Sequence, residues 1–181
     1  MYFLNDFYKR TLKFDLINKF YYVKLQKLPK LKQVILSFGC KTTEVKSIAT
    51  SLLALELITK QKGILTVSRR PNLLLKIRKG NPTGCKVSLK NSSKLIFFSK
   101  NLNEVFSKTK SFEGVNVSRK AEKTVVSFII KDILNFAELT DHYYLFNSLS
   151  NLNLSFITNS KTKEETFFLL KSLQLPIKSG K

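Results

Sequence analysis

The charged side chains of one segment of this sequence cannot be buried in any fold. Between Ser68 and Lys90 the chain carries seven cationic side chains and no acidic one, and the acid-free region extends from Leu57 to Asn103 with eleven lysines and arginines. Charge of one sign repels itself, so these side chains must face solvent or a polyanionic partner. Phosphate backbones are the commonest such partner, and the planar fork of arginine suits phosphate. The segment therefore predicts an RNA-binding protein.

The rest of the chain shares this bias and still has the means to fold. The 181 residues include 32 basic and 12 acidic side chains, which gives a net charge of +20, and 43% are hydrophobic, with fifteen phenylalanines. That apolar content is enough for a core, so the chain is not disordered as a whole. From its length we predict one domain over residues 1–181, with an N-terminal half (1–90) that holds the basic loop and a C-terminal half (91–181).

The apolar spacing predicts alternating helices and strands. Helices are expected over 2–20, 43–60, 92–108 and 162–173, the last opened by a capping box from Thr162 to Glu165. Strands are expected over 34–39, 64–68, 85–90, 124–130 and 152–157, with a long loop over 71–84. This order predicts an α+β fold, a mostly antiparallel sheet with helices packed on one face and a long basic loop.

No set of residues points to catalysis, a metal or a cofactor. His142 is the only histidine, and Cys40 and Cys85 are expected to be buried, reduced thiols, so a zinc site is not predicted. Three acidic residues could serve a metal-dependent nuclease, but we interpret them as part of a solvated turn: Asp132, Glu138 and Asp141. We predict that the protein is not an enzyme, with no catalytic residue, no metal and no cofactor.

Glycines and aromatic residues are ambiguous in the sequence. Gly80 and Gly84 flank Pro82 and either form a tight connection or bring the backbone close to a phosphate or sugar. Five phenylalanines have helical spacing and are expected in the core rather than as platforms for bases: Phe97, Phe98, Phe106, Phe167 and Phe168. Tyr143 and Tyr144 are expected on a short helical turn.

Three blocks of the sequence carry a resemblance to one known family. The first block is LNDFYK (4–9) with FYYVKLQKLPKLKQVILSFG (20–39). The second, over 61–90, contains LKIRKGNPTGCKVSLK and is similar to the family signature K-I-R-x-G-x-P-I-G-x-K-V-T-L. The third is LNLSFITNSKTKEETFFLLKSLQLP (152–176). Together they span nearly the whole chain in the family's order, and through them the chain resembles the universal large-subunit ribosomal protein number five, a family that binds 5S rRNA.

The resemblance implies a structural protein of the central protuberance of the large ribosomal subunit. Its implied partners are 5S rRNA, where one is present, large-subunit rRNA, neighbouring central-protuberance proteins and a small-subunit head protein, reached by an intersubunit bridge through residues 112–115. The residues carried over as rRNA contacts, with two lysines of the cationic strand, are Lys30, Lys32, Ser37, Lys60, Lys62, Arg69, Arg70, Lys86 and Lys90. A loop expected to face the P-site tRNA contains Lys76, Arg78, Lys79, Gly80, Asn81 and Pro82.

The chain departs from the family pattern at several positions. Leu73–Leu75 replaces the usual Ala-Gly-Phe, Thr83 replaces an apolar residue, and the arm over 113–123 is short. With the abundance of Lys, Asn, Phe, Tyr and Ile and an N-terminus unlike a transit peptide, these departures favour a protein made and used in the mitochondrial matrix. A plastid or a bacterial cytoplasm is the alternative.

Other classes of function remain open from the residues alone. A basic RNA- or DNA-binding protein outside the ribosome would share the same charge, but its binding would be labile to salt and tolerant of sequence. A peripheral membrane protein could use basic amphipathic helices. No apolar run approaches the roughly 18 residues of a membrane span, and we predict no membrane partner.

Overall fold

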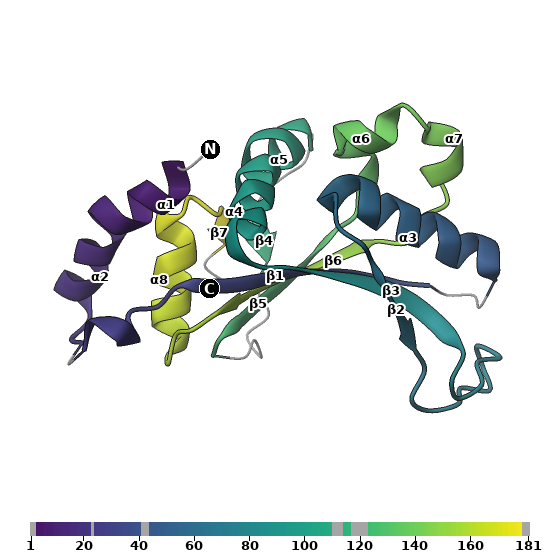
Figure 1. Ribbon diagram of the computed structural model, residues 1–181, viewed down its shortest axis with the longest axis horizontal. Helices are drawn as coiled ribbons and strands as arrows, with labels where there is room; N and C mark the ends of the chain where they lie inside the picture. The colour runs from purple at the N-terminus through teal and green to yellow at the C-terminus, as the bar shows by residue number, and fades with distance from the viewer. Residues whose placement is uncertain (1–2, 23, 41–43, 110–113, 117–122, 179–181) are drawn as a thin grey trace. The chain divides into compact units, whose positions relative to one another are not determined.

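The protein combines a five-stranded sheet with helices. The computed structural model describes residues 3–22, 24–40, 44–109, 114–116 and 123–178. The sheet has the strand order β2 (Ile64–Val67), β3 (Pro82–Leu89), β1 (Leu31–Gly39), β6 (Leu152–Thr158) and β5 (Val125–Ile130) (Figure 1). A second, parallel pair joins β4 (Val115–Asn116) to β7 (Ile177–Lys178). The prediction of an α+β fold with a mostly antiparallel sheet is confirmed.

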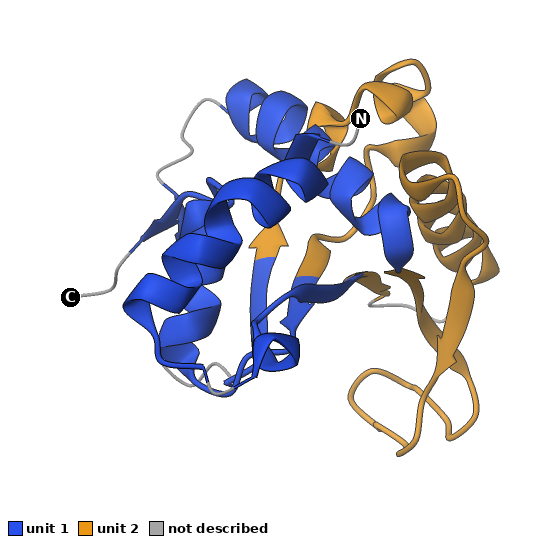
Figure 2. Cartoon of the chain, turned by 60° about the vertical axis from the view of Figure 1, so that its left-hand side comes forward, with its two compact units in different colours: residues 1–34, 90–128, 155–181 blue, residues 35–89, 129–154 orange. Residues whose placement is uncertain are grey.

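The chain divides into two compact units (Figure 2). Unit 1 contains residues 1–34, 90–128 and 155–181, and unit 2 contains residues 35–89 and 129–154. Strands β1, β5 and β6 contribute residues to both units. That the whole chain forms one domain stays a prediction.

In unit 1, the N-terminal helix is continuous but changes its winding. It consists of α1 (Phe3–Phe7), the π-helical turn η1 (Tyr8–Leu12) and α2 (Lys13–Lys19). Leu12 and Leu16 are fully buried, which fixes the inward face. The short 3₁₀ turn η2 (Leu25–Lys27) then leads into β1, and the hydroxyl of Tyr8 donates to the carbonyl of Pro29 at 2.9 Å. The predicted helix over 2–20 is therefore confirmed over the described residues.

Aromatic rings form much of the core of unit 1. The second predicted helix is α4 (Asn91–Lys100), the π-helical turn η3 (Asn101–Val105) and α5 (Phe106–Lys108). The rings of Phe98 and Phe156 lie 5.3 Å apart, and those of Phe106 and Phe128 lie 6.1 Å apart. Phe97, Phe98 and Phe106 are buried, as predicted.

The last helix, α8 (Lys163–Ser172), begins with the predicted capping box. The Thr162 hydroxyl accepts from the Glu165 N–H at 3.3 Å, and the Glu165 carboxylate accepts from the N–H groups of Lys161 and Thr162. The expectation that Phe167 and Phe168 are core residues is met only in part, because both are half-buried. The Phe168 ring instead lies under the Lys19 ammonium, 4.2 Å from it.

In unit 2, α3 (Val45–Thr59) packs against β3, and smaller helical turns complete the unit: η4 (Ile133–Asn135), α6 (Ala137–Thr140) and α7 (Tyr143–Phe146). These helices lie on one face of the unit's strands (Figure 1). Glu44 occupies the N-cap position of α3, whereas Thr43, where the predicted helix over 43–60 begins, lies outside the described residues. Tyr143 and Tyr144 lie on the short helical turn predicted for them, with exposed rings.

Candidate nucleic-acid interface

The basic segment forms an extension of the β2–β3 hairpin. The Ser68 N–H donates to the Asn81 carbonyl at 2.8 Å, and the Gly80 N–H donates to the Ser68 carbonyl at 2.9 Å. Farther out, Asn72 and Ile77 exchange two backbone hydrogen bonds of 2.9 Å, which close the tip at residues 73–76. The predicted loop over 71–84 is confirmed over 71–81, and β3 begins at Pro82. The segment closed by these backbone hydrogen bonds is called here the basic hairpin (68–81).

The tip of the basic hairpin is held by a side chain as well as by the backbone. The Asn72 amide oxygen accepts from the Leu74 N–H at 3.1 Å, and the Lys76 backbone has a positive φ of 51°. Ile77 is buried, but Leu73 and Leu74 are 92% and 94% exposed. The leucines that depart from the family pattern therefore project from a preorganised turn.

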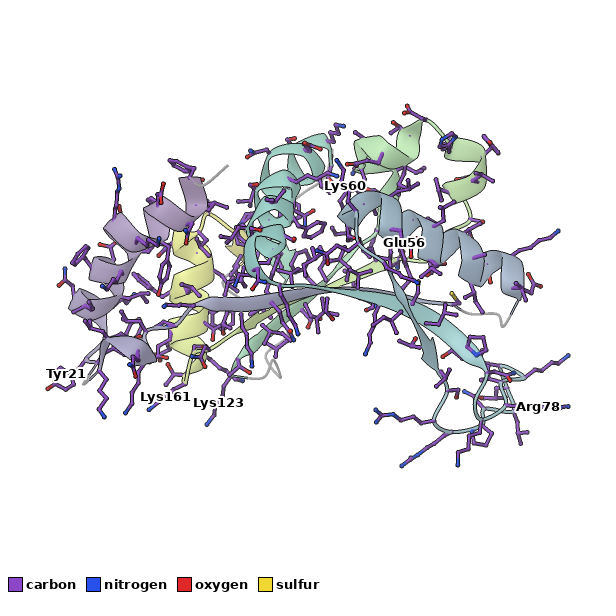
Figure 3. All side chains as sticks on the ribbon, viewed as in Figure 1. Tyr21, Glu56, Lys60, Arg78, Lys123 and Lys161 are labelled. Atoms are coloured by element: carbon purple, nitrogen blue, oxygen red, sulfur yellow. The ribbon has the colours of Figure 1, made fainter. Side chains whose placement is uncertain are left out.

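The two arms of the basic hairpin carry its cations side by side. Arg69 and Arg70 lie on one arm and Arg78 and Lys79 on the other, between the same two sets of backbone hydrogen bonds. All four side chains are exposed, as is Lys76 at the tip, and Figure 3 shows Arg78 at the far end of the hairpin. The sequence assigned Arg69 and Arg70 to rRNA and the other three to tRNA, whereas the structure places all five on one hairpin.

Gly80 and Gly84 are required for different structural reasons. Gly80 has a φ of 89°, in the left-handed region that favours glycine, and a side chain there would meet nothing within 4 Å. Gly84 lies inside β3, where a Cβ would clash with the backbone carbonyl of Phe38 and lie 3.0 Å from Thr66 Oγ1. Close packing of the strands thus explains why position 84 is a glycine, whereas the space around Gly80 is open.

The predicted residues of the sheet lie on the strands of unit 2. Lys86 is exposed on β3, and Ser37 is half-buried on the neighbouring strand β1. Their side chains alternate along each strand with buried ones, so they occupy the face away from the core. Ser88 on β3 and Asn153 on β6 are exposed by the same alternation. Sequence analysis did not select these two, although the alternation itself could have identified them.

Lys60 and Lys62 lie apart from the basic hairpin, after the end of α3. The Lys60 residue has a φ of 54° and its N–H donates to the Glu56 carbonyl at 2.8 Å. The Glu56 carboxylate in turn accepts from the Gly63 N–H at 2.9 Å. Lys60 lies beside α3, whereas Arg78 lies at the far end of the basic hairpin (Figure 3).

Unit 1 holds a second group of predicted cations. Lys30, Lys32 and Lys90 are exposed, and the structure adds Lys94, whose ammonium donates to the Lys32 carbonyl at 3.3 Å. Burial lowers the pKa of Lys94 below its ordinary value, and the nearby charge of Lys30 lowers it further. Crowded cations of this kind favour an anionic partner. Lys94 was missed because its helical position gives no sign that it approaches β1.

Metal-binding clusters and membrane-spanning helices are both absent among the described residues. In the described part of the chain, no three His, Cys, Asp or Glu side chains cluster in a way that could hold a metal ion. Among the same residues, every helix is too short or too polar to cross a bilayer. Cys40 and Cys85 are free thiols, as predicted, although Cys40 is only half-buried. Burial raises the pKa of Cys85 to about 12.

The proposed bridge arm is described only at its end. Phe112 and Glu113 lie outside the described residues, and Gly114 has a φ of 106°. Val115 is buried in β4, and its N–H donates to the Pro176 carbonyl at 2.7 Å. The intersubunit contact of this arm stays a prediction.

Comparisons with known proteins agree on one family. A family model that describes the C-terminus of the ribosomal L5 family matches residues 82–177. The large ribosomal subunit protein uL5m of Reclinomonas americana is 35% identical over 176 residues, which cover 96% of this chain and 97% of the relative. The uL5 protein of Clostridium acetobutylicum is 30% identical over 96% of both chains. That of Nitrosomonas europaea is 28% identical over 97% of this chain and 98% of its own.

The alignments with these relatives include both the basic hairpin and the region that the family model matches. The resemblance seen in the three sequence blocks is confirmed, because the aligned regions include nearly the whole chain. The prediction that the protein is not an enzyme is also confirmed, since the matched family consists of structural proteins. The chain belongs to the ribosomal L5 family.

Proposed function

We propose that this protein is a structural constituent of the large ribosomal subunit of mitochondria. In this proposal it binds 5S rRNA, where one is present, and large-subunit rRNA in the central protuberance. The name uL5m of the relative from Reclinomonas americana supports the mitochondrial version. Neighbouring central-protuberance proteins and, through the arm at 112–115, a small-subunit head protein complete the expected partners.

The observation that carries the proposal is the basic hairpin itself. Five exposed cations lie on a hydrogen-bonded scaffold in a region of the sequence without any acidic residue. A preorganised array of Arg and Lys loses little side-chain freedom when it binds, and it gives several phosphate contacts at once. In our proposal the tip faces the P-site tRNA, while Lys86, Ser37 and the cations of unit 1 contact rRNA.

Fractionation of mitochondria on a sucrose gradient tests the ribosomal role directly. The protein should comigrate with large subunits, and RNA crosslinked to it should map to 5S or large-subunit rRNA. A slowly sedimenting protein without bound rRNA would contradict the proposal. That outcome would favour the alternative of a basic RNA- or DNA-binding protein outside the ribosome.

The salt dependence of binding tests the role of individual cations. Replacing Arg69 and Arg70 by Ala should weaken RNA binding and reduce the salt slope by about one unit for each lost phosphate contact. Lys46→Ala, an exposed cation at the start of α3, is the control for lost charge alone. Equal slopes for the wild type and the double variant would show that these arginines make no phosphate contact.

The tip can be tested separately from assembly. Replacing Lys76, Arg78 and Lys79 by Ala should leave the protein in large subunits, because the proposed rRNA contacts, including Arg69 and Arg70 on the other arm, are unchanged. Binding of tRNA to the P site of those subunits should be weakened, as measured by filter binding at several salt concentrations. Loss of the protein from the subunit would instead assign these three cations to assembly.

A further inference from the structure

The N-terminal helix and the turn before β1 line a pocket in unit 1. The pocket has a volume of about 290 Å³, and it is called here the Tyr8 pocket. Its apolar surface comes from the ring of Tyr8 and from Leu25 and Leu28. Leu28 is buried, Leu25 is mostly exposed, and Tyr8 is fixed by its hydrogen bond to the Pro29 carbonyl. The apolar surface is therefore built on ordered residues.

The polar lining of the Tyr8 pocket has one sign of charge. Three lysines and one amide line it, without a carboxylate: Lys9, Lys13, Lys30 and Gln26. Lys9 and Lys13 are four residues apart on the helix, which places them on one side of it. The Gln26 amide can both donate and accept hydrogen bonds. An anionic ligand with a flat apolar part and polar edges fits this combination.

The local backbone is unusual at the same place. Tyr8 and Lys9 begin the π-helical turn η1 (Tyr8–Leu12), and Lys13 is the first residue of α2 after it. A π-helical turn stabilises a helix less well than regular α-helical winding and frequently marks a functional site. Here it lies where the helix faces the pocket.

We propose that the Tyr8 pocket receives one unstacked nucleotide of the bound RNA. The base would lie against the Tyr8 ring and the two leucines, the Gln26 amide would contact the base edge, and the three lysines would contact phosphates. Proteins recognise RNA largely through bulges and loops whose bases are free to leave the stack. The volume lies just below the roughly 300–1,000 Å³ range of small-molecule pockets, which suits a single base. This inference rests on the proposed binding of rRNA.

The test compares two RNA hairpins of equal length, one fully paired and one with a single bulged nucleotide, each bound to the full-length protein. We expect the wild type to prefer the bulged RNA by about tenfold, because stacking on an aromatic ring adds to phosphate binding and a bulged base is easily unstacked. Gln26→Leu and Tyr8→Ala should reduce this preference to less than about threefold. Tyr8→Phe keeps the ring and should retain the preference.

Charge and folding are controlled within the same experiment. Lys13→Ala should lower the salt slope for both RNAs by about one unit, whereas Gln26→Leu should leave both slopes unchanged. Circular dichroism checks that each variant is folded. Because Gln26 is exposed, Gln26→Leu serves where Tyr8→Ala fails to fold.

Three results would overturn the inference. The first is equal affinity of the wild type for the two RNAs, and the second is a preference that survives in folded Gln26→Leu and Tyr8→Ala. The third is loss of the preference on addition of inorganic phosphate at the concentration of RNA phosphate, which would indicate a simple anion site. Comigration with large subunits without a bulge preference would refute only the pocket. A bulge preference in a protein absent from ribosomes would refute only the ribosomal role.

Discussion

Replacement of Gly84 by Ala tests how tightly the strands of unit 2 are packed. The added Cβ would clash with the carbonyl oxygen of Phe38, which belongs to the backbone of β1 and cannot rotate away. It would also lie 3.0 Å from the Thr66 hydroxyl on β2, so the two neighbouring strands block relief on either side. Overpacking of this kind costs about 1–3 kcal/mol, and we expect a value near 3 kcal/mol because the clash is with backbone.

The chain offers a matched control on the adjacent strand. Gly39 ends β1, and a Cβ there would meet nothing within 4 Å. Gly39→Ala should therefore be neutral or stabilise the fold by about 0.4–1 kcal/mol, through lower entropy of the unfolded chain. Gly80→Ala is a second comparison, since its positive φ alone should cost about 1–2 kcal/mol.

Urea unfolding followed by far-ultraviolet circular dichroism measures these differences, because the chain contains no tryptophan for fluorescence. A loss near 3 kcal/mol corresponds to a decrease in melting temperature of about 6–12 °C for a chain of this size. Gly84→Ala should be the least stable of the three variants. A change of less than about 0.5 kcal/mol for Gly84→Ala would refute the packing argument, since ordinary surface substitutions have effects of that size.

Three further predictions concern thiols, a helix cap and pH. Because the pKa of Cys85 is raised to about 12, only about one thiol in 10⁴ is a thiolate at pH 8; Ellman's reagent should label Cys40 first and Cys85 only on unfolding, and rapid labelling of both in the native protein would contradict this. Thr162→Ala should destabilise the protein by about 1 kcal/mol in urea, with Thr162→Ser close to wild type, because the hydroxyl caps α8; equal loss in both would exclude the cap as the cause. The lowered pKa of Lys94 means that its charged form is disfavoured in the folded state, so this penalty is present below the folded pKa and disappears as pH rises toward 10.5. The stability of the wild type relative to Lys94→Met should therefore increase over that alkaline range, and a pH-independent difference would contradict the assignment.

Helices and strands could be predicted where residues close together in the sequence form a recognisable pattern. Strand β1, helix α3 and the capping box at Thr162 were expected from apolar periodicity and from hydrogen-bonding residue types at fixed spacing. The basic hairpin has the composition of a loop, because its one proline, one glycine and two asparagines are typical of turns. Its order comes from backbone hydrogen bonds between Ser68 and Asn81 and between Asn72 and Ile77, which leave no periodic pattern of side chains.

The sequence predicts which cationic residues belong to the candidate site, but it does not predict how these residues are arranged in space. Exposure of every selected lysine and arginine follows from the energetic cost of burying charge, so this part was accessible to sequence analysis. The proximity of Lys94 to Lys32 depends on how α4 packs beside β1. The Tyr8 pocket depends on a π-helical turn and on a distant turn at residues 25–30, and neither has a signature in the sequence.

The exposed leucines of the hairpin tip have a consequence for the newly made protein. Leu73 and Leu74 project into water from a hydrogen-bonded turn, and β2 at the edge of the sheet exposes Ile64, Leu65 and Val67. Free copies are kept apart mainly by their mutual repulsion at +20, and salt or a polyanion weakens that repulsion. A copy that has lost its repulsion before it reaches its assembly site can pair through the strand edge and aggregate. The supply of this chain must therefore be matched to that of its RNA, and orphan copies are natural substrates for chaperones and proteases.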